Sequence, residues 1–229
     1  MSSACVACAQ PGAAAPGGGQ LLEASIVLLI AVSLLELRSK RGLAWAAAAA
    51  LLGFAAEYVG VNMGMIFGNY RYSPGAPLIG GVHPLVPLAW AAVVHASMQA
   101  ASTWGRRRPL VAAAYAVLFD LAVDPIASTV FHIWEWGGGG PTLFTVPLEN
   151  FAAWFVLAYV MALLYERMCG APRGYASQAV IMGVIGLHIA LGAPLCGYPW
   201  CPYWAAAAVG VLAAYGYSLS RRWRRASSG

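Results

Sequence analysis

The chain of 229 residues is 61% hydrophobic and only 9% charged. Soluble domains carry about 25% charged residues, so the composition excludes an ordinary soluble domain and indicates a polytopic membrane protein. The net charge of +5 does not imply nucleic-acid binding, because all of the 13 basic residues except Arg71 fall in short connections or in the C-terminal tail, where membrane topology favours them.

The chain begins with a leader at residues 1–19 that is rich in Ala, Gly and Pro. This leader lacks the basic segment and apolar core of a standard signal peptide, so we interpret it as flexible. Cys5 and Cys8 form a lone C-x-x-C there, for which the sequence offers no metal-binding or redox partner. Residues 20–220 are predicted to form one membrane domain, and residues 221–229 a basic cytoplasmic tail.

Seven stretches of the membrane domain approach the roughly 20 mostly apolar residues that a membrane-spanning helix needs. They cover residues 20–37, 43–66, 84–103, 110–130, 150–168, 175–194 and 203–220. Several of them start or stop at Pro or Gly, as helix ends often do. The sequence therefore predicts an all-α polytopic bundle of about seven transmembrane helices.

Basic residues predict the orientation of this bundle. Those of the first, third and fifth connections and of the tail fall on one side of a seven-span topology, whereas the other side holds Arg71 alone. Cytoplasmic loops carry an excess of Lys and Arg. We therefore expect the N-terminus outside and the C-terminus in the cytoplasm, in an integral protein of the cell membrane.

Three acidic residues lie inside the apolar stretches: Glu57, Asp120 and Asp124. A charged side chain at the centre of a bilayer costs about 2.5–3.5 kcal/mol on insertion scales, so such residues face a packed interior or a wet cavity and indicate function. Asp120 and Asp124 are four residues apart, which puts both carboxylates on one helix face. Two close carboxylates tend to share a proton, which leaves one of them as an acid near neutral pH.

Two local features bear on the surroundings of these acids. Gly60, Gly64 and Gly68 form a small-xxx-small series on the same helix face as the first acid, and such a series predicts close packing on another helix. Pro125 directly follows the last acid, so that helix should kink or end nearby, because proline donates no backbone hydrogen bond. A purely structural role for each acid, as a hydrogen-bonding group or a helix cap, is the alternative interpretation.

Five short motifs follow one another in the middle of the chain. They are GMIFGNYRY at 64–72, VPLAW at 86–90, DLAVDP at 120–125, WEW at 134–136 and VPLENFAAW at 146–154. Their order resembles that of the CruF-type membrane proteins of carotenoid biosynthesis, which include carotenoid hydratases such as the archaeal bisanhydrobacterioruberin hydratase. The series is specific, although each motif alone would be weak, and the chain departs from the family pattern at Thr145 and Ala153.

The resemblance implies addition of water across the terminal isopropylidene double bond of an acyclic carotenoid, similar to bisanhydrobacterioruberin or lycopene, with no cofactor. It also implies a long apolar substrate in contact with membrane lipid, and association with other membrane enzymes of the carotenoid pathway. No metal site is expected, because the sequence holds neither an H-E-x-x-H motif nor paired C-x-x-C motifs.

Hydration of an alkene needs an acid, stabilisation of a transient tertiary carbocation, and an ordered water beside a base. Asp120 and Asp124 would supply the acid and its ionised partner, and Glu57 would position the water or accept its proton. Aromatic faces would stabilise the cation, and the polyene would lie along apolar helix faces and enter sideways from lipid. The predicted substrate-binding residues are Asn62, Tyr70, Arg71, Tyr72, Trp90, Trp134, Trp136, Glu149, Asn150 and Trp154.

Three other functions remain open from the sequence. A lycopene cyclase protonates a similar end group but traps the cation with an internal double bond. A membrane prenyltransferase would use D-x-x-x-D to hold magnesium against a diphosphate, although such enzymes usually have two acidic motifs. A proton-coupled transporter would use the buried acids as a proton relay.

Overall fold

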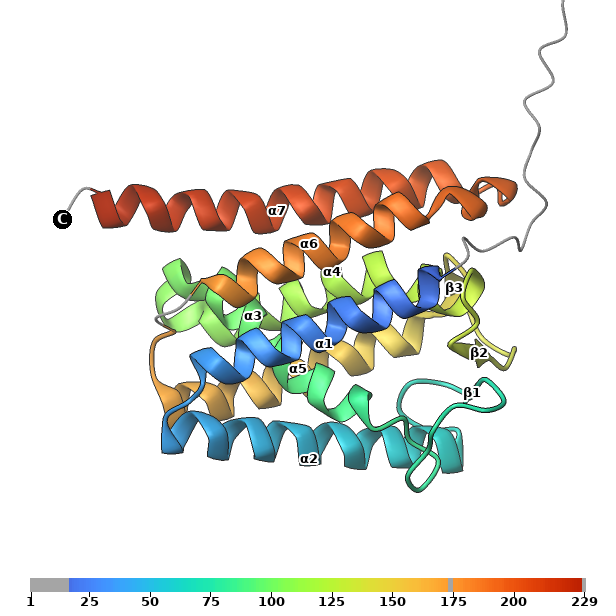
Figure 1. Ribbon diagram of the computed structural model, residues 1–229, viewed down its shortest axis with the longest axis horizontal. Coiled ribbons are helices and arrows are strands. Elements are labelled where there is room, and N and C mark those ends of the chain that lie inside the picture. The colour runs from blue at the N-terminus through green and yellow to red at the C-terminus, as the bar shows by residue number, and fades with distance from the viewer. Residues whose placement is uncertain (1–16, 173–174, 228–229) are drawn as a thin grey trace, which may run out of the picture.

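A computed structural model describes residues 17–172 and 175–227 as a helical bundle with short β-strands at one end (Figure 1). Cys5, Cys8 and most of the predicted leader lie outside the described residues. The α-helices are α1 Gly18–Glu36, α2 Lys40–Met63, α3 Leu85–Ala100, α4 Arg108–Thr129, α5 Leu148–Cys169, α6 Ala176–Leu191 and α7 Cys201–Ser227. The shorter elements are β1 Tyr70–Tyr72, η1 Ala101–Arg107, β2 Trp134–Trp136, β3 Thr142–Leu143, β4 Val146–Pro147 and η2 Ala193–Gly197. The predicted all-α class is confirmed.

Four helical stretches within the described residues are long and apolar enough to cross a membrane: Gly18–Glu36, Lys40–Met63, Leu85–Thr129 and Leu148–Cys169. As one straight helix, the third would be about 68 Å long, more than twice the roughly 30 Å of a bilayer core. Gly105 interrupts it with φ 55° and ψ −129°, and α3 and α4 pack against each other. The seven-span topology and the orientation of the termini stay predictions.

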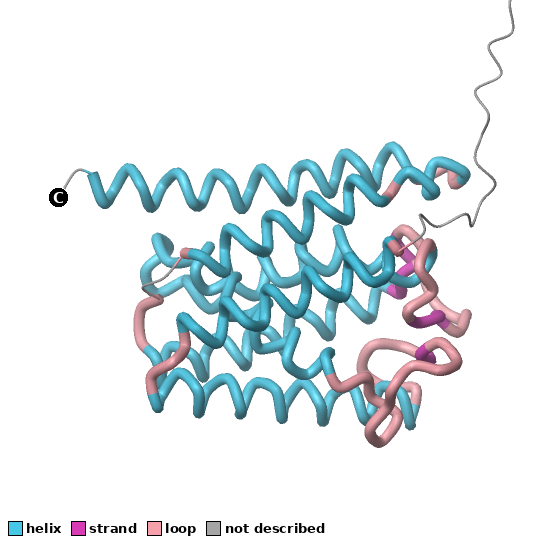
Figure 2. Tube along the Cα trace, viewed as in Figure 1, coloured by secondary structure: helices cyan, strands magenta, loops and turns pink. Residues whose placement is uncertain are grey.

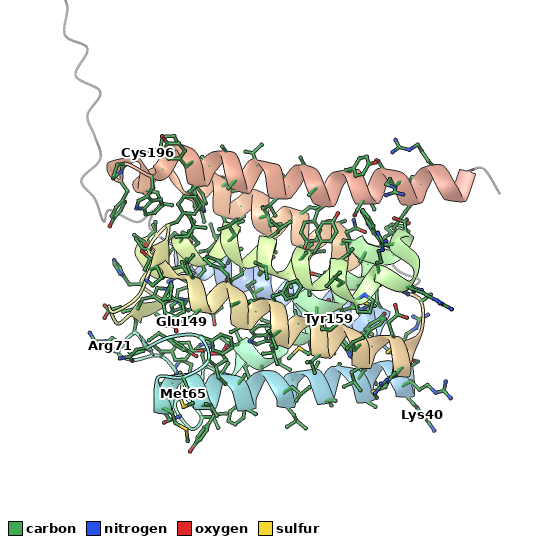
Figure 3. The ribbon with its side chains drawn as sticks, turned by 180° about the vertical axis from the view of Figure 1, so that it is seen from behind. Lys40, Met65, Arg71, Glu149, Tyr159 and Cys196 are labelled. Atoms are coloured by element: carbon green, nitrogen blue, oxygen red, sulfur yellow. The ribbon has the colours of Figure 1, made fainter. Side chains whose placement is uncertain are left out.

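The connections divide between the two ends of the bundle (Figure 2). The strands and the long loops lie at one end, where Figure 3 shows Arg71, Glu149 and Cys196. The short connection between α1 and α2 lies at the opposite end, with Lys40 and the C-terminal end of α7. The predicted orientation of the termini depends on this division of the connections between the two ends.

α3 is the central helix of the bundle. All of its residues from 90 to 100 are buried, and it packs against α1, α2, α4, α5 and α6. Ala91, Ala92 and Ala96 belong to this buried stretch, and small side chains let neighbouring helices approach closely. α1 packs mainly on α3 and α6, whereas α2 packs mainly on α3 and α5, so α1 and α2 flank α3 on different sides.

Local capping sets the ends of α2. The Ser39 hydroxyl accepts a hydrogen bond of 3.1 Å from the Gly42 N–H at the start of the helix. Gly64 takes the left-handed conformation with φ 63° at its end, which glycine adopts without steric cost. The helix therefore starts before and stops short of the predicted range 43–66, because hydropathy does not report caps.

The glycine series at the end of α2 serves the following loop and not a second helix. A Cβ at Gly60 would lie 3.0 Å from the Phe67 ring and 3.1 Å from the Tyr70 ring. Gly64 ends the helix, and Gly68 lies in the loop with φ 95°. The expected helix–helix contact is thus replaced by the close approach of a loop that carries two aromatic rings onto α2.

β1 and β2 form an antiparallel ribbon over the end of the bundle. The register pairs Tyr70 with Trp136, Arg71 with Glu135 and Tyr72 with Trp134. Successive side chains of a strand point to opposite faces, so Tyr70 and Tyr72 are buried while Arg71 is exposed. Arg71 pairs with Glu135 at 2.7 Å, which gives the lone basic residue of this end an acidic partner.

Candidate functional site

Asp120 and Asp124 lie one turn apart on the buried face of α4, with exposures of 4% and 2%. Asn150, in the first turn of α5, donates from Nδ2 to Oδ2 of both residues, at 2.7 Å to Asp120 and 3.3 Å to Asp124. Two carboxyl groups that share one donor nitrogen are close enough to influence each other's ionisation. The spacing of four residues thus brings the pair to one place, as the sequence predicts.

Asp124 has a second donor from the β-ribbon. Nε1 of Trp134 donates to its Oδ1 at 2.8 Å. α4 continues through Pro125 and ends at Thr129, so the predicted end of the helix falls one turn after the proline. The Ser128 hydroxyl donates to the backbone carbonyl of Asp124 at 2.8 Å, the bond that a serine inside a helix often makes to the residue four positions earlier.

Glu57 lies on α2 across from the aspartate pair and is also buried. Trp90 Nε1 donates to its Oε1 at 3.0 Å, and the hydroxyls of Tyr70 and Tyr72 donate to its Oε2, the latter at 3.3 Å. Burial and the nearby Glu57 carboxylate raise the pKa of both tyrosines well above the usual range. Both phenols therefore remain hydrogen-bond donors at every ordinary pH.

The three acids line one cavity of about 370 Å³, within the range of small-molecule sites. α1, α2, α3, α4, α5 and α6 contribute to it, together with the β-ribbon. Aromatic side chains make up much of its wall: Phe67, Tyr70, Tyr72, Trp90, Phe119, Trp134, Trp136 and Trp154. No Lys or Arg of the described residues lines it, so the carboxyl groups have aromatic N–H, phenol and amide donors in place of a cation.

The closest ring pair of the aromatic wall is a stack of two tryptophans. Trp90 of α3 and Trp154 of α5 stack with centroids 3.9 Å apart and planes inclined by 26°. An added Cβ at Gly53 of α2 would lie 3.0 Å from the Trp90 ring. The glycine, one turn before Glu57, thus lets Trp90 approach α2 closely enough for its N–H to reach the Glu57 carboxylate.

Most of the predicted site residues meet at this cavity. The three acids line it, and so do Tyr70, Tyr72, Trp90, Trp134, Trp136, Asn150 and Trp154. The structure does not bring Asn62, Arg71 or Glu149 to it. The amide of Asn62 donates to the carbonyls of Tyr58 and Gly80, Arg71 pairs with Glu135, and Glu149 is exposed near Gly68.

Sequence reasoning missed the contribution of α1. Gly19, Leu22 and Ile26 line the cavity, and Glu23 is an exposed acid at the same wall. Glu23 is an acid in an apolar stretch, which is the signal that identified the other three acids. His188 of α6 also lines the cavity, but its Nδ1 bonds the carbonyl oxygen of Val184 in its own helix at 2.8 Å.

The described residues contain no group of three or more His, Cys, Asp or Glu side chains placed to hold a metal ion. The fold and the cavity define a membrane helix-bundle protein with buried acids behind an aromatic wall. The sequence pattern of the carotenoid biosynthesis protein family matches residues 19–216, and the chain belongs to this family. No curated protein and no solved structure matches the chain. The family predicted from the five motifs is confirmed, and with it a role in carotenoid biosynthesis.

Proposed function

We propose that the protein is a carotenoid hydratase of the cell membrane, which adds water to the terminal isopropylidene double bond of an acyclic carotenoid. The convergence of Glu57, Asp120 and Asp124 on one aromatic cavity carries this proposal. An isolated trisubstituted alkene reacts with water only after it is protonated. A buried acid, a π-rich wall and a second carboxyl group are the components of that reaction.

Asp120 is the proton donor in this proposal. Its carboxyl group receives the hydrogen bond from Asn150, whereas Asp124 has two side-chain donors and Glu57 has three. Each donor stabilises a carboxylate relative to the neutral acid, and several uncompensated charges in one buried site are costly. A proton shared among these three acids is therefore most stable on Asp120.

The proposed reaction needs no cofactor. The Asp120 proton adds to the less substituted alkene carbon, whose π electrons form the new C–H bond, and a tertiary carbocation develops on the other carbon. Aromatic faces such as those of Trp90 and Trp154 stabilise this cation, each by up to about 2 kcal/mol when desolvated. The wall formed by Tyr70, Tyr72, Trp134 and Trp136 would hold the reacting end against the acids.

Water then completes the reaction. Its oxygen forms the new C–O bond to the cation, and Glu57 accepts the proton that this water releases. The product is a tertiary alcohol. The proton returns to Asp120 within the same cavity, which restores the starting state, and no electrons are gained or lost overall.

Expression in a host that accumulates lycopene or bisanhydrobacterioruberin tests the proposal. The pigments are analysed by mass spectrometry, and we expect products heavier by one water for each hydrated end. Cyclised pigment of unchanged mass would instead identify a cyclase. Dependence on magnesium and a prenyl diphosphate would identify a prenyltransferase, and uncoupler-sensitive uptake of an unchanged solute would identify a transporter.

Gly53→Ala is expected to lower the hydration rate about tenfold or more, because small displacements of a positioned group are costly to catalysis. The added methyl group displaces the Trp90 ring, and with it both the Glu57 hydrogen bond and the Trp154 stack. Gly183→Ala in α6 is the matched control, since an added Cβ there meets nothing within 4 Å. Equal rates in both variants would contradict a positioning role for Trp90.

A further inference from the structure

A second hollow lies between α1, α2 and α3. It has a volume of about 230 Å³ and is almost wholly apolar. The α2 side consists of Leu43 and small side chains, Ala46, Ala47 and Ala50, and the floor consists of Leu88, Ala91 and Ala92 of α3. We call this hollow the alanine groove. It exists because α1 and α2 pack on different sides of α3.

The alanine groove continues the line of the acid-lined cavity along α1. The cavity is bordered by Gly19, Leu22 and Ile26, and the groove by Ile30 and Leu37. These positions recur every three, four or seven residues, so they form one face of the helix. A single stripe of α1 therefore borders both hollows.

α2 shows the same succession, whereas α3 borders both hollows at one level. On α3, Ala89 and Val93 line the cavity while Leu88 and Ala92 line the groove. On α2, Ala50 of the groove precedes Glu57 of the cavity by seven residues, or two helical turns, on the same face. All three helices therefore border both hollows, and α1 and α2 lead from one to the other.

The combined length of the acid-lined cavity and the alanine groove suits a long and narrow hydrocarbon. From Gly19 to Leu37 the stripe of α1 measures about 27 Å at the rise of an α-helix, close to the roughly 30 Å of a bilayer core. The cavity alone, of about 370 Å³, falls at the lower end of the sizes of sites for drug-sized ligands. It can enclose the reacting end of a carotenoid but not its whole chain.

We propose that the alanine groove binds the polyene chain of the substrate whose end lies at the three acids, and so selects for substrate length. This inference rests on the proposed hydratase function. Ala47 is exposed and Ala50 is half-buried, and both line the groove, so a larger apolar side chain at either position can occupy the groove without displacing the buried core. The small residues keep the groove open, and a larger side chain there would exclude the chain while leaving the acids untouched.

The test compares the double variant Ala47→Phe/Ala50→Phe with the control Ala44→Phe/Ala55→Phe, which alters exposed alanines of α2 that line neither hollow. Lycopene serves as the long substrate, and a short acyclic isoprenoid with the same terminal double bond as the short one. We expect the groove variant to hydrate lycopene about tenfold more slowly or worse, because burial of even two methylene groups is worth such a factor. The short substrate should react at the wild-type rate.

Two results would overturn the groove proposal: unchanged lycopene hydration, or an equal loss with both substrates. Loss of co-purified phospholipid with unchanged lycopene hydration would assign the groove to a lipid chain instead. Failure of the hydratase function itself is separate, since the wild-type protein would then convert neither substrate. Lycopene retained through purification gives a readout without turnover, and the proposal requires the groove variant to retain less of it than the control variant.

Discussion

Asp120→Asn is expected to abolish the addition of water to the carotenoid end, because it removes the proton donor, and Asp124→Asn to do the same, because it removes the ionised partner that shares the Asn150 donor with Asp120. Asparagine matches aspartate in shape but cannot deliver a proton, and a general acid contributes about 10²- to 10⁴-fold to a rate. The double bond of the substrate has no other activation in this mechanism. Mass spectrometry of the pigments from expressing cells should therefore show no increment of water with either variant.

The matched control for these changes is Glu135→Gln. Glu135 is also an acid of the strand-bearing end, but it pairs with exposed Arg71 and does not line the cavity. Its variant should keep the wild-type yield of hydrated pigment. The amount of each variant in the membrane fraction separates lost chemistry from lost insertion. If the Asp120 variant inserts and remains fully active, the proposed acid is wrong.

The helices were predictable because hydropathy reports apolar length, but their ends depend on features that hydropathy does not report. α7 runs to Ser227, beyond the predicted limit of 220. In this extension, the Arg221 guanidinium lies 5.4 Å from the Trp104 ring centroid, a contact that favours a cation near an aromatic face. A helix that ends in long basic side chains can continue beyond its apolar part. A prediction from hydropathy stops where the charged residues begin.

The acids of the site were predictable for a related reason. A carboxyl group in an apolar helix needs a compensating environment, and the spacing of Asp120 and Asp124 then places the two together. Hydropathy could not predict that YRY at 70–72 pairs with WEW at 134–136. Both triplets alternate aromatic and charged residues, with Arg71 opposite Glu135, so their complementary charges were a readable signal for the ribbon.

Some predicted site residues do not reach the cavity, because the position of a residue along the chain does not determine where its side chain points. Glu149 and Asn150 are adjacent in sequence, but successive residues of a helix point about 100° apart. Asn150 faces the aspartates, whereas Glu149 is exposed. A shared level in the membrane therefore does not imply a shared cavity, and the direction of each side chain depends on the packing of α5 against α4.

Glu57→Gln is expected to lower the hydration rate by a factor of about 10² or more, within the range for loss of a general base. The amide cannot take the proton of the attacking water. Its oxygen can still accept from Trp90 Nε1 and its NH₂ group can donate to the tyrosine hydroxyls, so the change removes the base without leaving these groups unpaired. The rate is measured as the yield of hydrated pigment per amount of inserted protein.

A purely structural role for Glu57 predicts a different pattern, since its three donors also tie α2 to α3 and to the β-ribbon. Tyr72→Phe removes the hydroxyl that donates to Glu57 at 3.3 Å and leaves the carboxylate in place. If Glu57 is the base, Tyr72→Phe keeps most of the rate even where it lowers the melting temperature, whereas Glu57→Gln loses the rate even where the melting temperature is unchanged. If Glu57 only holds the fold, the rate and the melting temperature fall together in both variants, and the base must be sought in the aspartate pair.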